Sequence, residues 1–145
     1  MSDPREHTRA DYRHFLAIPT RWMDNDTYGH VNNVTYYSYF DTVVNAHLVK
    51  DGGLDIRNDA TVGFVVETSC RYFRPITFPE SIDAGMRVTR LGRSSVTYEI
   101  ALFRQGEPHP AATGRFVHVW VDRKTVTPAE IPARIRAALQ PLVVE

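Results

Sequence analysis

The sequence of 145 residues lacks several features that mark whole classes of proteins. Its single cysteine, Cys70, makes an intrachain disulfide impossible and is typical of a reducing compartment. Neither charge is in excess, with 17 basic and 17 acidic residues, and this argues against a general nucleic-acid binder, which needs a basic surface for phosphates. No apolar run approaches the roughly 18 residues of a membrane span. Residues 1–11 lack the apolar segment of a signal peptide. We therefore expect a cytoplasmic protein without nucleic-acid or membrane partners.

Length and composition predict one globular domain over residues 1–145. Hydrophobic residues make up 43% of the chain and charged residues 23%, as in ordinary globular proteins. The polar residues 1–12 are predicted to form a loose N-terminal arm. Residues 127–145 are predicted to form a short C-terminal helix and tail, in which the helix begins either after Thr127 or at Pro132.

Hydrophobic periodicity divides the rest of the chain into strands and one long helix. Alternating patterns predict strands over residues 14–24, 63–74, 82–90, 95–104 and 111–122, and a helical pattern covers residues 33–50. In the strand over 63–74, the alternation places Phe64, Val66, Cys70 and Tyr72 on one face. The strand over 111–122 is apolar on both faces, so we expect the helix on one side and a second subunit on the other. The prediction is an α+β fold, with a long helix packed on a five-stranded antiparallel sheet.

The densest cluster of polar residues runs from Arg21 to Asn33, between a core strand and the start of the long helix. A helix start offers free backbone N–H groups and the positive end of the helix dipole, which suit an anion or an oxyanion. Asp24 and Asp26 precede it, and a carboxylate there could attack a carbonyl or activate water. Asp and Asn also favour turns and helix caps for local hydrogen-bonding reasons alone.

The pattern Asp24-x-Asp26-x-x-Gly29-His30-Val31-Asn32-Asn33, with Tyr36 and Tyr39 on the helix, resembles the hotdog-fold acyl-CoA thioesterases. It is most similar to the 4-hydroxybenzoyl-CoA thioesterase-like family, and the resemblance covers about residues 15–124. The resemblance implies a hotdog fold, in which the sheet wraps around the long helix. It also implies subunits that pair edge to edge into a homodimer or homotetramer, with active sites at the interface. The implied activity hydrolyses an acyl-CoA to a carboxylic acid and CoA.

The resemblance also assigns roles to the residues of this turn. Asp26 matches the catalytic carboxylate, as nucleophile or general base, and Asp24 would brace the turn. Gly29 and His30 match the turn that enters the helix, where a backbone N–H near Asn33 would polarise the thioester carbonyl. A thiol leaving group, with a pKa of about 8.5, needs little acid assistance, so one carboxylate and an oxyanion hole suffice. No Gly-x-Ser-x-Gly motif is present, which disfavours an α/β-hydrolase mechanism.

The substrate stays open in two respects. The 4-hydroxybenzoyl-CoA enzymes carry apolar and aromatic residues where this chain has His30, Asn32 and Asn33, and this difference favours the broader acyl-CoA branch. Thioesterases that act on acyl-carrier proteins carry a similar motif, so the carrier is open as well. Two other classes are a hotdog module that only binds acyl-CoA, and a hotdog dehydratase, which needs a His and a carboxylate placed differently on the helix.

Four further residues are candidates for substrate binding. Tyr36 could line the acyl pocket. Arg90, Arg93 and Ser94 lie at the predicted hairpin between the third and fourth strands, where arginines could hold the phosphates of CoA or simply face solvent. His30 could bond Asp26, the substrate, or only the turn.

The remaining reactive side chains are not assigned to chemistry. Cys70 is predicted to be a small core residue, and His118 a core or interface residue. The six histidines, taken with Asp24 and Asp26, show no metal-ligand spacing such as His-x-x-x-His, so we expect no metal. We expect no cofactor either, because coenzyme A is part of the substrate.

Overall fold

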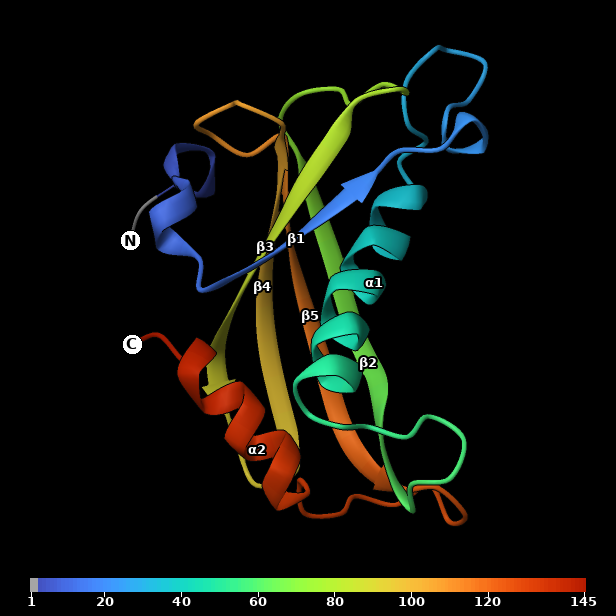
Figure 1. Ribbon diagram of the computed structural model, residues 1–145, viewed down its shortest axis with the longest axis vertical. Coiled ribbons are helices and arrows are strands. Elements are labelled where there is room, and N and C mark those ends of the chain that lie inside the picture. Colours follow the sequence, from blue (N-terminus) through green and yellow to red (C-terminus); the bar gives the residue numbers. More distant parts are fainter. Residues whose placement is uncertain (1–2) are drawn as a thin grey trace.

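The computed structural model describes residues 3–145, which form one antiparallel sheet and two α-helices. The elements in chain order are β1 (His14–Pro19), α1 (Thr35–Lys50), β2 (Thr61–Tyr72), β3 (Ser81–Leu91), β4 (Ser95–Arg104), β5 (Ala112–Asp122) and α2 (Ala133–Leu139). The order in the sheet is β1-β3-β4-β5-β2 (Figure 1). The predicted five-stranded antiparallel sheet with one long helix is confirmed. Within residues 3–145, no helix is long and apolar enough to cross a membrane.

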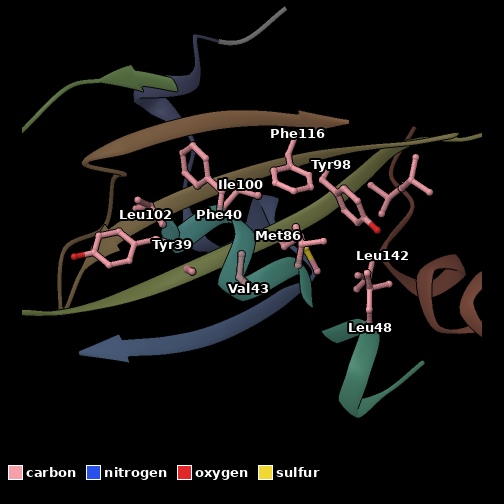
Figure 2. Close-up of a cluster of buried hydrophobic side chains, with 14 of the residues drawn as sticks. Tyr39, Phe40, Val43, Leu48, Met86, Tyr98, Ile100, Leu102, Phe116 and Leu142 are labelled. Carbon is pink, nitrogen blue, oxygen red and sulfur yellow. The ribbon is translucent and has the colours of Figure 1, made fainter. Parts of the chain in front are cut away.

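The core lies between α1 and one face of the sheet. Figure 2 shows side chains of α1 meeting those of β4 and β5, and all of them are buried: Tyr39, Phe40, Val43, Ile100, Leu102 and Phe116. The ring of Phe40 packs directly on the β5 backbone at Gly114. A Cβ atom added to this glycine would lie 2.3 Å from the ring. A glycine at this position therefore lets the helix approach the sheet closely.

Helix α1 begins two residues later than the sequence predicts, at Thr35 rather than Asn33. Asn32 accounts for the difference, because it bonds the N–H groups of both residues that follow Asn33. Its Oδ1 accepts from Val34 N at 2.9 Å, and its carbonyl accepts from Thr35 N at 2.9 Å. Asn33 thus lies before the helix, in the turn that leads into it.

The N-terminal arm is not loose, which corrects the prediction for residues 3–12. Two short 3-10 turns, Pro4–Glu6 and Arg9–Asp11, lead to Tyr12, whose side chain is buried. Arg9 bonds Asp83 at 2.7 Å and lies over the ring of Phe103 at 4.9 Å. These contacts with the outer face of the sheet hold the arm in place. Met1 and Ser2, which the prediction included, lie outside the described residues.

Strand β5 carries a buried aromatic row on its inner face, formed by Phe116, His118 and Trp120. Burial lowers the pKa of His118 to about 4. On the outer face, Val117 and Val119 are half-buried by the described chain. The helix therefore covers one face of β5 as predicted, and the expectation of a second subunit on the other face stays a prediction.

Strand β2 forms one edge of the sheet and carries exposed apolar side chains. Phe64 is 53% exposed and Val66 54% exposed. A bulge shifts the register with β5 between Val65 and Glu67. The alternation therefore changes face, so that Phe64 pairs with Val119 of the outer face while Cys70 pairs with Gly114 of the inner face. The prediction that Phe64 and Cys70 share a face is wrong, because strict alternation does not allow for a bulge.

Candidate active site

The turn between β1 and α1 is held by a bridge within the turn and by hydrogen bonds to the segment that follows β2. Asn25 and Val31 form a short antiparallel bridge that closes the turn. Val31 N donates to the carbonyl of Ile76 at 2.7 Å, and Asn25 Oδ1 accepts from Phe78 N at 3.0 Å. The segment that follows β2 therefore supports the turn, although it is about fifty residues distant in sequence.

Gly29 gives this turn its shape. Its backbone has φ +86°, which L residues with a side chain rarely adopt, and its N–H donates to the Asp26 carbonyl at 3.1 Å. The predicted role of Gly29 in the turn entering the helix thus has a conformational basis.

Asp24 is buried, and its carboxylate accepts several hydrogen bonds. Arg21 donates from its backbone N at 2.9 Å and from its guanidinium at 3.0 and 3.1 Å. Tyr39 Oη of α1 donates at 2.8 Å. Burial raises the pKa of Asp24, but these hydrogen bonds and the Arg21 charge outweigh it and hold the pKa below its usual range. Asp24 therefore joins the segment that follows β1 to α1, as expected of a bracing residue.

Asp26 is only half-buried and contacts N–H groups rather than cations. Its Oδ1 accepts from Tyr28 N at 2.8 Å, and its Oδ2 accepts from Asn32 Nδ2 at 3.2 Å. Its backbone N donates to the His30 carbonyl at 2.9 Å. Two donors orient the carboxylate, and its remaining lone pairs can accept a proton or approach an electrophile.

The backbone N–H of Asn33 has no hydrogen-bond partner within residues 3–145. Its carbonyl is held by Tyr72 Oη of β2, which donates at 2.8 Å. The free N–H therefore lies directly before α1 and one residue after Asn32, whose side chain bonds the Asp26 carboxylate. A donor of this kind can stabilise negative charge that develops on a carbonyl oxygen.

A pocket of about 290 Å³ opens beside this N–H group. Its walls come from the turn, α1 and the segment after β2: His30, Val31, Asn33, Tyr36, Tyr72, Phe73, Arg74 and Pro75. Asp26 is not among these residues and adjoins the pocket through Asn32 and His30. The pocket is wide enough for part of a small-molecule ligand and is open to solvent.

The structure brings some of the predicted site residues together and separates others. Asp26, Gly29, His30 and Asn33 share the turn, and the buried Tyr36 lines the pocket. The exposed His30 contacts Asp26 through the backbone, and no hydrogen bond joins its ring to the carboxylate.

Arg90, Arg93 and Ser94 lie at the β3–β4 hairpin, at the end of the sheet opposite the start of α1 (Figure 1). Arg90 is exposed, and Arg93 lies 3.8 Å from Glu130. The Ser94 carbonyl accepts from Trp120 N at 2.7 Å. Within one chain, this hairpin does not reach the turn that holds Asp26.

Sequence reasoning assigned no role in the site to Tyr72 or Arg74, two of the residues that line the pocket. Tyr72 fixes the carbonyl of Asn33, and Arg74 supplies a positive charge to the wall of the pocket. The only signal for them was their place at the end of a predicted strand, which does not indicate the element that they contact.

A family model and several solved structures resemble this chain over most of its length. The family model of the Thioesterase-like superfamily matches residues 20–139. The crystal structure of the PA5185 protein from Pseudomonas aeruginosa is 54% identical and has a TM-score of 0.92, with 94% of this chain and 95% of that chain covered. PA2801, a candidate thioesterase of the same species, is 31% identical with a TM-score of 0.82, over 88% of this chain and 98% of that chain.

A thioesterase from Thermus thermophilus, crystallised with coenzyme A and zinc, is 29% identical to this chain. Its TM-score is 0.75, with 91% of this chain and 95% of that chain covered. The family match covers most of the chain, and the relatives share its fold over nearly their whole length. By its sequence and its fold, the chain belongs to the Thioesterase-like superfamily, with the hotdog architecture.

Proposed function

We propose that this protein is an acyl-CoA thioesterase, which hydrolyses a thioester to a carboxylic acid and free CoA. The observation that carries the proposal is the unpartnered N–H of Asn33 at the entrance to α1, beside a pocket and on the same turn as Asp26. Membership of the superfamily supports the reaction type. The relative crystallised with coenzyme A supports CoA as the carrier.

In this proposal, Asn33 N–H bonds the thioester carbonyl oxygen, and Asp26 acts on its carbon. As a general base, the carboxylate of Asp26 takes a proton from water while the water oxygen bonds the carbonyl carbon. The C–S bond then breaks, and the thiolate of CoA takes up the proton. As a nucleophile, Asp26 would instead attack the carbonyl carbon and expel the thiolate of CoA as the C–S bond breaks, which gives a mixed anhydride. Water hydrolyses the anhydride in a second step, and the proton released there is taken up by the thiolate. Both routes use the same oxyanion donor.

The other predicted residues take supporting places. Gly29 shapes the turn, and His30 and Tyr36 line the pocket that would receive the substrate next to the thioester. The hairpin of Arg90, Arg93 and Ser94 lies far from Asp26 of the same chain. In this proposal, the hairpin therefore binds the phosphates of a CoA whose thioester lies at the Asp26 of another copy of the chain. Paired copies with sites at their interface are therefore part of the proposal.

The experiment is a thiol-release assay with short, long, branched and aromatic acyl-CoAs, together with the matching acyl-carrier-protein thioesters. We expect release of CoA, with the preferred acyl group defining the branch of the superfamily. Release from acyl-carrier protein alone would support the alternative carrier. Binding of every thioester without release would contradict the proposed hydrolysis and support a hotdog module that only binds acyl-CoA.

A further inference from the structure

Two histidines and a carboxylate meet at the end of α1 that is remote from the pocket. His14 is the first residue of β1, His47 lies in the last turn of α1, and Asp51 directly follows the helix. One potential ligand atom from each residue lies within 4.8 Å of the other two. The rings of His14 and His47 are 4.7 Å apart between centroids.

The hydrogen bonding of His47 leaves one ring nitrogen without a partner. Its Nε2 lies 2.8 Å from the carbonyl of Ala138, which can only accept, so Nε2 carries the hydrogen. In the neutral ring, Nδ1 therefore carries a lone pair. This buried atom has no hydrogen-bond partner within the described residues, although the side chain is only 6% exposed.

The unpartnered nitrogen faces a carboxylate oxygen. His47 Nδ1 lies 2.8 Å from Asp51 Oδ2. A neutral ring and an ionised carboxylate would place two lone pairs against each other here. Such a contact is favourable only if something positive lies between the two atoms, and this can be a proton on the ring or a metal ion bound by both.

We propose that His14, His47 and Asp51 bind one divalent transition-metal ion of the zinc type. Two imidazole nitrogens and one carboxylate are common zinc ligands, with bond lengths of about 2.0–2.2 Å. In a tetrahedral site, ligand atoms are then about 3.4 Å apart. The ligand atoms of this cluster all lie within 4.8 Å of one another, so they need only a small adjustment, which is outward for the 2.8 Å contact between His47 Nδ1 and Asp51 Oδ2. Water supplies the fourth ligand.

The surroundings fit a metal ligand set in two further ways. The bond from His47 Nε2–H to the Ala138 carbonyl is the kind of outer contact that fixes the tautomer and orientation of a metal-bound histidine. The Asp51 side chain is 56% exposed, so an ion can enter from solvent. Lys50 contributes an opposing positive charge nearby, which weakens binding without blocking the ligands.

The proposed site is structural rather than catalytic. Helix α1 has 16 residues and is therefore about 24 Å long, which separates the ion from the turn of Asp26. The ion would join the start of β1 to the end of α1. This revises the sequence-based expectation of no metal, which did not consider the i, i+4 spacing of His47 and Asp51.

The experiment uses untagged, chelator-treated full-length protein, titrated with Zn²⁺ by calorimetry and with Co²⁺ by visible absorption. We expect saturable binding of one ion per chain, the intense absorption of tetrahedral Co²⁺, and a Zn²⁺-dependent rise in Tm. His14→Ala and Asp51→Asn should each weaken binding at least tenfold. Both residues are partly exposed, so circular dichroism can verify that the variants fold.

The matched controls are His30→Ala and Asp41→Asn, which change an exposed histidine and an exposed aspartate outside the cluster. They should bind Zn²⁺ as the wild type does. The proposal is overturned if the wild type binds no ion saturably, or if His14→Ala and Asp51→Asn bind as tightly as the controls. In that case, a protonated His47 paired with Asp51 accounts for the short contact.

Discussion

Asp24 and Asp26 are separated by one residue but lie in different environments. Asp24 is 2% exposed and is surrounded by donors from Arg21 and Tyr39. Asp26 is half-buried, and within residues 3–145 its carboxylate accepts only from Tyr28 N and Asn32 Nδ2. A saturated carboxylate holds a structure together, whereas a carboxylate with free lone pairs can take part in a reaction. We therefore expect replacement of Asp24 to lower stability and replacement of Asp26 to lower activity.

Replacement of Asp24 with Asn should destabilise the protein. The amide cannot accept from Arg21 and Tyr39 as the carboxylate does, so we expect a loss of about 1–3 kcal/mol in the free energy of unfolding at pH 7. The folded-state pKa of Asp24 lies below its usual value, so its charge stabilises the fold above the unfolded pKa of about 3.9, and this stabilisation is lost as the pH falls through the folded pKa.

Urea unfolding across this pH range measures both effects. The difference between wild type and Asp24→Asn should shrink on acidification. An equal difference at neutral and acidic pH would contradict the assignment.

Tyr72→Phe tests how the oxyanion donor is positioned. The hydroxyl bonds the Asn33 carbonyl at 2.8 Å, and the ring packs edge-on against Tyr36. The variant keeps the ring but removes the hydrogen bond that holds the Asn33 carbonyl. We therefore expect kcat to fall about three- to tenfold with KM nearly unchanged. The matched control is Tyr28→Phe, an exposed tyrosine of the same turn. Equal effects of the two changes would show that Tyr72 does not position Asn33.

Sequence patterns predicted the turn before α1 better than they predicted the residues that support it. The cluster from Arg21 to Asn33 is local, so its turn and helix entrance could be predicted from residue types alone. Tyr72 lies 39 residues beyond Asn33, and only the packing of β2 beside α1 brings its hydroxyl to that carbonyl. Contacts of this kind depend on tertiary structure and leave no local pattern.

At the scale of elements, periodicity predicted the strands and the helix but not their irregularities. The bulges in β2 and β3 each shift the pairing by one residue. In β2 the shift moves Cys70 to the inner face, where burial raises the pKa of its thiol to about 11 and keeps it protonated at neutral pH. The later start of α1 likewise follows from the hydrogen bonds of Asn32, which outweigh the apolar pattern.

The buried histidine of β5 predicts a pH dependence of stability. Burial lowers the folded-state pKa of His118 to about 4, whereas an unfolded histidine has a pKa of about 6.5. Below pH 6.5 the unfolded chain binds a proton that the folded chain rejects. The free energy of unfolding should therefore fall as the pH drops from about 6.5 to 4, by roughly 3 kcal/mol.

His118→Leu removes this titration and keeps an apolar side chain against Tyr98 and Trp120. Denaturant unfolding between pH 7 and pH 4 should show a shallower decline for the variant than for the wild type. Parallel curves would mean that His118 is protonated in the folded state or is not buried there.

At the scale of the whole molecule, the exposed edge of β2 predicts association. Phe64 and Val66 are both more than half exposed on β2, which within residues 3–145 has a neighbouring strand, β5, on one side alone. Such edges invite pairing with another chain. We expect the wild type to sediment as a dimer or a multiple of it.

A double variant, Phe64→Lys with Val66→Lys, should release the 16.6 kDa chain and reduce thioester hydrolysis with it. The control is Ile56→Lys, which introduces the same charge at an exposed loop residue outside the sheet. A double variant that sediments like the wild type would exclude β2 as the pairing edge.

The catalytic role of Asp26 is tested by the turnover of Asp26→Asn on the preferred thioester. Asp41→Asn is the control, because it makes the same chemical change at an exposed residue. Asparagine can still accept from Tyr28 N but cannot take up a proton or form an anhydride, so kcat should fall by at least about a hundredfold while Tm stays close to that of the wild type. Turnover of Asp26→Asn equal to that of Asp41→Asn, in a folded protein, would contradict the account.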